Sequence, residues 1–271
     1  MNQTYVTVLS TDDYLPGVLA LARNIGETCS FPLLVLASRA LGEGTFEELR
    51  RRGIPFVQAD DIEAPEGMLR ATQEHFWYKH WAKSLFKLRI FDLVEYDKIV
   101  FIDCDIMLLD SVDEVFDFPD MSAVIAGAAY PGNEGWVDLN SGFMAIVPRE
   151  GLSERIAALI PEVAARKAIF GDQDLIQAYF ADWRQDKKLH LAGGYNVYFD
   201  HYQFYLGRGP VKAVHFIGRR KPWMMDAYHI AREYIKCLAK GNRKGIPVLR
   251  RYLGLVRDAR GDANPGEASR K

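Results

Sequence analysis

The stretch Lys87–Asp105, with the sequence KLRIFDLVEYDKIVFIDCD, decides the fold. Within it, Lys98 is followed by four apolar residues, a composition typical of a fully buried strand. This strand ends abruptly at Asp103. Upstream, the apolar residues of Tyr78–Val94 recur at helical spacing and predict an amphipathic helix. A helix that leads into a buried strand is the repeating unit of α/β proteins, so the stretch predicts a largely parallel sheet with Asp103 at its carboxyl edge.

Short apolar runs alternate with segments of helical period through the rest of the first half, which is the pattern of βαβ units. Strands are predicted at Tyr5–Leu9, Pro32–Ala37 and Ile54–Gln58, helices at Leu15–Ile25 and Thr45–Arg52, and a loop at Glu63–His75. The second half has apolar runs at Ala123–Ala128 and Phe143–Val147, a loop at Tyr130–Leu139 between them, and a last strand at Val211–Ile217. Further helices are predicted at Leu152–Ala165, Asp172–Phe180, Ala227–Ala239 and Pro247–Arg257.

Composition and charge exclude several classes of protein. The chain has 271 residues, of which 49% are hydrophobic and 26% are charged, and its formal net charge is −2. It has no excess of positive charge with which to neutralise nucleic-acid phosphates, so no nucleic-acid partner is expected. Its three cysteines are far apart and predict neither a disulfide framework nor a zinc site. With no signal-peptide pattern and no apolar run of membrane-spanning length, we expect a cytoplasmic protein, or one that touches the inner membrane surface.

Asp103 and Asp105 are the first candidate ligands of a metal ion. In an extended segment, side chains two residues apart point to the same side, so both carboxylates face one way and Cys104 faces the other. Carboxylates together with substrate phosphates suit Mg²⁺ or Mn²⁺, and the ligands of open α/β sheets bind beyond the carboxyl ends of the strands. The alternative is coincidence, because a second Asp-x-Asp occurs at residues 172–174. Only Asp103 ends a strongly apolar strand, which favours the first pair.

The same stretch resembles the core of glycosyltransferase family 8, and within that family the glycogenin and galactinol synthase branch. Four further segments occur in the family's order: Tyr5–Tyr14 (YVTVLSTDDY), Leu139–Met144 (LNSGFM), Gly171–Asp174 (GDQD) and Val214–Trp223 (VHFIGRRKPW). Five motifs in the family's order make the resemblance specific.

The resemblance implies an α/β fold of the GT-A type: a single domain with a Rossmann-like, mostly parallel sheet flanked by helices, and a C-terminal helical extension. The expected divisions are a catalytic domain over 1–225, a basic helical extension over 226–258 and a disordered tail over 259–271. The implied activity is a retaining, metal-dependent transfer of a hexose from a UDP-sugar, UDP-glucose or UDP-galactose, to a hydroxyl group. The acceptor would be a saccharide, a lipid-linked sugar or a small polyol.

The resemblance also implies a metal site made by Asp103, Asp105 and His215. Imidazole as the third ligand favours Mn²⁺, with Mg²⁺ as the alternative. Considered without the resemblance, His215 is better interpreted as a hydrogen-bonded core histidine at the end of a strand.

A donor-binding set is implied in the same way. It consists of Leu9, Ser10, Thr11, Tyr14, Lys87, Asp103, Cys104, Asn140, Ser141, Gly218 and Lys221. Lys221 would also act in catalysis, by offsetting the charge on leaving UDP. Asp172 and Gln173 are the other catalytic candidates, although Asp172 equally suits the N-cap of a helix. We favour attack by the acceptor from the leaving-group face, with Gln173 stabilising the sugar, over a carboxylate nucleophile at Asp172 or Asp174.

Other functions and partners remain open. A sugar-1-phosphate nucleotidyltransferase would also use a Rossmann-like sheet and metal-binding aspartates, but the loop Ser10–Tyr14 lacks the glycines of that class. A non-catalytic nucleotide-sugar-binding protein is a further alternative. The segment Lys236–Arg260 mixes basic and apolar residues, which fits either a membrane-surface element or a helix packed on the catalytic domain. A homodimer is also considered. The family's acceptor tyrosine falls near Gln203, so self-glucosylation is not favoured.

Overall fold

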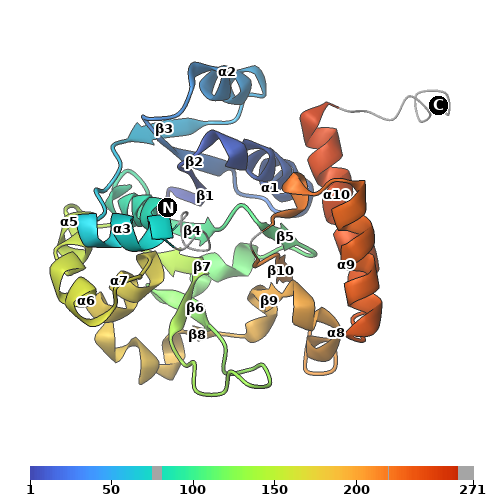
Figure 1. Cartoon of the computed structure of the whole chain (residues 1–271). Helices are drawn as coiled ribbons and strands as arrows, with labels where there is room; N and C mark the ends of the chain where they lie inside the picture. Colours follow the sequence, from blue (N-terminus) through green and yellow to red (C-terminus); the bar gives the residue numbers. More distant parts are fainter. Residues whose placement is uncertain (75–80, 219, 262–271) are drawn as a thin grey trace.

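The computed structural model describes residues 1–74, 81–218 and 220–261. Its main sheet has the spatial order β3-β2-β1-β4-β7-β6-β8 (Figure 1). The strands are β1 (Gln3–Leu9), β2 (Leu33–Ser38), β3 (Phe56–Ala59), β4 (Lys98–Ile102), β6 (Ser122–Ile125), β7 (Leu139–Ile146) and β8 (His190–Leu191). The first four are parallel neighbours, whereas β7 is antiparallel to β4 and β6. The predicted α/β fold with a mostly parallel sheet is confirmed.

A second, smaller sheet positions the candidate site. It consists of β5 (Ile106–Leu108), β10 (Ala213–His215) and β9 (Val197–Tyr198), with β10 antiparallel to β5 and parallel to β9. The register places His215 opposite Ile106, the residue after Asp105. Strand β10 is shorter than the predicted strand Val211–Ile217.

The helices cover both faces of the main sheet. They are α1 (Leu15–Thr28), α2 (Glu43–Arg51), α3 (Glu66–Glu74), α4 (Trp81–Ser84), α5 (Leu152–Ala157), α6 (Ile160–Arg166), α7 (Asp172–Tyr179), α8 (Tyr202–Tyr205), α9 (Ala227–Ala239) and α10 (Gly245–Arg260). In Figure 1, α5, α6 and α7 lie on the side away from α9 and α10. No helix in the described ranges is both long and apolar enough to cross a bilayer.

Three predicted segments differ from the structure. The loop expected at Glu63–His75 is wrong, because α3 occupies much of it and buries Met68 against the core; His75 itself lies outside the described residues. The helix predicted at Leu152–Ala165 is two helices, since Pro161 near the start of α6 has no N–H to continue the hydrogen-bond ladder of α5. Strand β7 begins at Leu139, where the predicted loop was to end.

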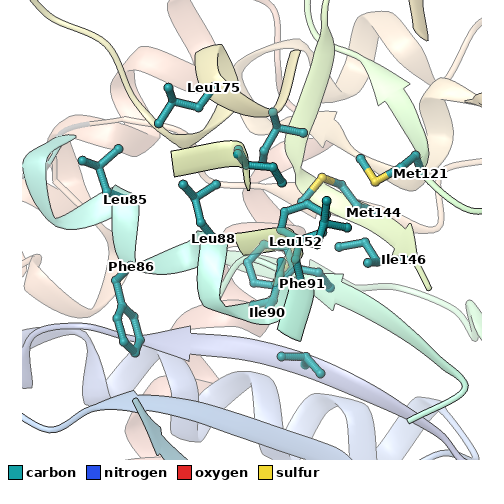
Figure 2. Close-up of a cluster of buried hydrophobic side chains, with 14 of the residues drawn as sticks. Leu85, Phe86, Leu88, Ile90, Phe91, Met121, Met144, Ile146, Leu152 and Leu175 are labelled. Carbon is teal, nitrogen blue, oxygen red and sulfur yellow. The ribbon is translucent and has the colours of Figure 1, made fainter. Parts of the chain in front are cut away.

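The segment before β4 also differs from the single helix predicted for it. Residues 78–80 of the helix expected at Tyr78–Val94 lie outside the described part, and from Trp81 the chain forms α4 and then a 3-10 helix, η3 (Leu85–Asp92). In Figure 2, Leu88, Ile90 and Phe91 of this segment lie beside β7 and α5, whereas Phe86 points towards the blue N-terminal strands. Six of its eight residues are buried, and Lys87 is one of them. The core therefore encloses a lysine.

The C-terminal helix α10 packs on the opposite face, against α1. Its residues Leu249, Tyr252, Leu255 and Val256 are buried in a cluster that also contains Cys104. The apolar residues of α10 therefore belong to the core. The predicted tail from residue 259 begins inside α10, and its residues 262–271 lie outside the described part.

A buried asparagine joins α1 to the small sheet. Asn24 Oδ1 accepts the backbone N–H of Leu108 at 2.6 Å, and Asn24 Nδ2 donates to the carbonyl of Leu108 at 3.1 Å. Because β5 is an edge strand, these two backbone groups face away from β10, and Asn24 occupies the place of a neighbouring strand. The position of β5, and with it of Asp105, depends on this side chain.

Replacing Asn24 by alanine should therefore destabilise the fold. Two buried backbone groups would lose their partners, so we expect the free energy of unfolding to fall by about 2–5 kcal/mol in urea titrations. The neighbouring Arg23→Ala is the control, because its ion pairs are about half exposed and should contribute less than about 1 kcal/mol. Equal losses in the two variants would show that Asn24 does not hold β5.

Candidate active site

Asp103, Asp105 and His215 converge at the carboxyl edge of β4. One ligand atom from each lies within 4.8 Å of the other two. The segment between the aspartates is a turn and not extended chain, closed by a hydrogen bond from the Ile106 N–H to the Asp103 carbonyl at 3.0 Å. The turn still directs the two carboxylates to one site, while Cys104 is buried in the core on the other side.

Gly142 allows this convergence. It lies in β7 beside β4, and its carbonyl accepts the Asp103 N–H at 2.8 Å. A Cβ atom on Gly142 would lie 2.8 Å from Cε1 of His215 and 2.9 Å from Oδ2 of Asp103. Only glycine leaves room for the carboxylate and the imidazole to approach each other here.

Asp105 is almost fully buried and remains ionised. Its Oδ1 lies 3.1 Å from His215 Nε2, and its Oδ2 forms an ion pair with Lys221 Nζ. Burial alone would raise the pKa of Asp105, but the Lys221 ammonium outweighs it and holds the pKa well below its usual range. Two carboxylates and one imidazole, with their ligand atoms close together, are a donor set that fits a divalent metal ion.

Lys87 neutralises two carboxylates and does not lie on the surface. Its Nζ is 3.0 Å from Asp103 Oδ1 and 2.9 Å from Asp172 Oδ2, and it also donates to the Ser141 carbonyl at 3.3 Å. Burial alone would lower the pKa of Lys87, but the carboxylates of Asp103 and Asp172 outweigh it and raise the pKa. This lysine brings Asp172, from a distant helix, into the same centre as Asp103.

The start of α7 adds Gln173 to the site. Gln173 Oε1 accepts the Ser141 N–H at 3.2 Å. Gly171, and not Asp172, is the N-cap residue of α7, and the carboxylate of Asp174 accepts the Gly171 N–H at 3.0 Å. The predicted alternative of Asp172 as an N-cap is therefore wrong, and its carboxylate is left to pair with Lys87.

The donor-binding candidates around Tyr14 lie near a cleft of about 980 Å³ between the Lys221 loop and α9, and Tyr14 and Gly218 line it. The Tyr14 ring packs edge-on against Trp223 at 5.4 Å, and burial raises its pKa to about 12. Gly218 has a φ angle of 143°, which favours glycine. Of the remaining candidates, the Thr11 hydroxyl donates to the Asp13 carboxylate, Ser10 is half-buried and Leu9 is fully buried.

Asn140 is a buried side chain beside the candidate metal ligands. Its side chain bonds to Tyr198, Gly142 and Asn196. Asn196 and Tyr198 were not among the predicted site residues, and β9, which carries Tyr198, has only two residues. A strand so short leaves no periodic signal in the sequence, so neither residue could be found that way.

Relatives among known proteins include glycogenins and UDP-glucuronate:xylan alpha-glucuronosyltransferases. Glycogenin-1 of Homo sapiens is 26% identical over 230 residues, which cover 82% of this chain and 62% of that protein. The putative UDP-glucuronate:xylan alpha-glucuronosyltransferase 5 of Arabidopsis thaliana is 28% identical over 222 residues, covering 81% of this chain and 36% of that protein. The chain thus spans less than two thirds of these curated relatives.

Solved structures show the same fold. The galactosyltransferase LgtC, solved with donor and acceptor sugar analogs, superposes with a TM-score of 0.59 at 18% identity, covering 98% of both chains. The glycosyltransferase GlyE of Streptococcus pneumoniae TIGR4 gives a TM-score of 0.55 at 14% identity, covering 86% of this chain and 64% of that one. The fold is of the GT-A type, as expected. The model of Glycosyl transferase family 8 matches residues 5–227, and the chain belongs to that family.

Proposed function

We propose that this chain is a retaining, metal-dependent glycosyltransferase that moves a hexose from a UDP-sugar to a hydroxyl acceptor. The observation that carries the proposal is the convergence of Asp103, Asp105 and His215 beside Lys221, in a chain of this family. The name of the Arabidopsis relatives includes a UDP-sugar, which supports that class of donor. UDP-glucose and UDP-galactose are the proposed donors, and a saccharide, lipid-linked sugar or small polyol is the proposed acceptor.

Separate residues would bind the metal ion and the diphosphate. Asp103, Asp105 and His215 would hold Mn²⁺, or Mg²⁺ in its place, and the ion supplies Lewis-acid stabilisation of charge on the diphosphate. Lys221 is a buried cation that is paired with Asp105. Its burial strengthens its attraction for the negative charge that develops on leaving UDP. Tyr14 and Gly218 line the adjacent cleft, which we assign to the nucleotide.

The carboxylates near the sugar position favour attack from the leaving-group face. Asp172 is paired with Lys87, and Asp174 is paired with Lys167 and caps α7. A carboxylate held in an ion pair is a weaker nucleophile, because forming a covalent bond would leave its partner cation uncompensated. Gln173 presents a neutral amide in the same place and could stabilise the sugar without reacting.

Donor hydrolysis is the direct measurement. With Mn²⁺ and no acceptor, we expect slow UDP release from one UDP-sugar of a panel, lost in EDTA and reduced about 100-fold or more in Asp105→Asn. Asp110→Asn, at an exposed aspartate on the same segment, should be unaffected. If no UDP-sugar binds even in the presence of Mn²⁺, the proposed function is wrong.

Gly142→Ala tests the geometry of the metal centre. The added methyl group would enter the space between His215 and Asp103, so we expect Mn²⁺ affinity, measured by electron paramagnetic resonance, to fall about tenfold or more. Gly26→Ala is the control, since nothing lies within 4 Å of a Cβ atom there. Unchanged Mn²⁺ affinity in Gly142→Ala would place the ion elsewhere.

The C-terminal extension is proposed to touch the inner membrane surface through α9. Because α10 is packed into the core, the exposed apolar residues of the extension are Tyr228, Ile235 and Leu238 on α9, which are 68%, 67% and 51% exposed. Residues 226–258 carry eight Lys or Arg against three Asp or Glu, whereas residues 1–225 carry 23 against 31. A helix with an apolar stripe and basic surroundings suits an anionic bilayer.

Vesicle co-sedimentation tests this contact. Replacing Tyr228, Ile235 and Leu238 by serine should reduce pelleting with phosphatidylglycerol vesicles about tenfold, since the apolar area that enters the bilayer is lost. Serine at three exposed apolar residues elsewhere, Val94, Trp136 and Val137, is the matched control. Equal pelleting of the two variants would contradict membrane contact, and a dimer that dissociates only in the α9 variant would assign the stripe to a second copy.

A further inference from the structure

A chain of hydrogen bonds runs from the backbone of β7 to the imidazole of His215. The Gly142 N–H donates to Asn140 Oδ1 at 2.8 Å, and Asn196 Nδ2 donates to the same oxygen at 2.8 Å. Asn196 Oδ1 lies 2.9 Å from His215 Nδ1. Asn140, Asn196 and His215 are 6%, 1% and 6% exposed, so water has little access to these groups.

The direction of every bond in this chain follows from its first member. A backbone N–H can only donate, so the Asn140 atom that meets Gly142 must be the amide oxygen. The other amide atom of Asn140 is then the nitrogen, which donates to the Tyr198 hydroxyl at 2.9 Å. The Asn196 atom that faces the Asn140 oxygen must be a donor, which is its nitrogen, so the oxygen of Asn196 faces His215.

The last step fixes the proton of the imidazole. An amide oxygen only accepts, so Nδ1 of His215 must carry a hydrogen. In the neutral ring, Nε2 then holds a lone pair, and this lone pair points at Asp105 Oδ1, 3.1 Å away. Two lone pairs at this distance repel each other unless a cation lies between them, so the arrangement favours a bound ion.

Without Asn196 the opposite tautomer would be preferred. The Asp105 carboxylate is a strong acceptor next to Nε2, and a hydrogen on Nε2 would form a direct, charge-assisted bond to it. Such a bond would occupy the lone pair that a metal needs. The amide of Asn196 therefore competes with Asp105 for the single ring proton of the neutral histidine.

We propose that Asn196 and Asn140 are positioning residues that hold His215 as its Nδ1–H tautomer, so that Nε2 is free to bind a divalent ion. The role rests on the proposed metal-dependent function, and neither residue touches the reacting atoms. Tyr198 fixes the other end of Asn140, and its own N–H donates to the Tyr130 hydroxyl at 3.1 Å. The tautomer is thereby set by one backbone N–H in β7.

Asn196→Leu is the decisive variant, because leucine is of similar size and can form no hydrogen bond. In metal-free protein, at a pH where the ring is neutral, the imidazole ¹⁵N shifts of His215 should report Nδ1–H in the wild type and Nε2–H in this variant. Mn²⁺ affinity, measured by electron paramagnetic resonance without donor, should fall about 10- to 100-fold. Asn196→Ala removes the same amide without adding bulk and should likewise show Nε2–H.

Asn242→Leu is the matched control. Asn242 is also buried, and its side chain donates to the Phe199 carbonyl at 2.7 Å and accepts the Gln203 N–H at 3.0 Å. Its loss should lower stability and leave both the tautomer and the Mn²⁺ affinity unchanged. Tautomer and metal affinity must change together in Asn196→Leu alone.

The proposal is overturned if the wild type carries its hydrogen on Nε2. It is also overturned if Asn196→Leu keeps the Nδ1–H tautomer and binds Mn²⁺ within about twofold of wild type. If Asn196→Leu does not fold, Asn196→Ala decides through the tautomer that it shows. A wild type that shows Nδ1–H but binds no divalent ion would refute the metal-dependent function and leave the tautomer assignment standing, so the two failures are distinguishable.

Discussion

Three carboxylates meet at one edge of the main sheet, and the balance of their charge is the constraint on which the rest of the structure depends. The side chains of Asp105 and Asp172 are 8% and 9% exposed, and that of Asp103 is 23% exposed. Burial favours the neutral form of a carboxyl group, and a neighbouring cation opposes this effect. Lys87 serves Asp103 and Asp172, and Lys221 serves Asp105.

The two lysines come from segments that are far apart in the chain, and the elements that carry them bring both to the same site. The 3-10 helix η3 carries Lys87 into the core before β4, and the loop after β10 returns Lys221 to the turn that follows β4. Buried ion pairs add little net stability compared with apolar packing. Their value here is that the carboxylates and the two lysines are held close together before any ligand arrives, which is the kind of preorganisation that electrostatic catalysis uses.

The long elements and the two aspartates could be predicted from the sequence, whereas the way in which the site is assembled could not. Strands such as β1 and β4 are continuous apolar runs, and α9 has the bounds predicted for it. In the small sheet only β10 gave such a signal, within the predicted strand Val211–Ile217, whereas β5 and β9 have three and two residues and form only through distant partners. The burial of Lys87 and the role of Asn196 depend on those long-range contacts, which helical or strand periodicity does not encode.

Tyr252 of α10 contacts both segments that carry the candidate metal ligands. The Tyr252 hydroxyl donates to the Cys104 carbonyl at 3.1 Å, and the Tyr252 ring stacks on Phe216, the neighbour of His215, with a centroid distance of 4.6 Å. The turn that carries Asp103 and Asp105 and the strand that carries His215 are therefore both packed against the same side chain. Because one side chain contacts both segments, a displacement of Tyr252 would act on the turn and on the strand together. A substitution at Tyr252 would therefore disturb the geometry of a site that α10 itself does not enter.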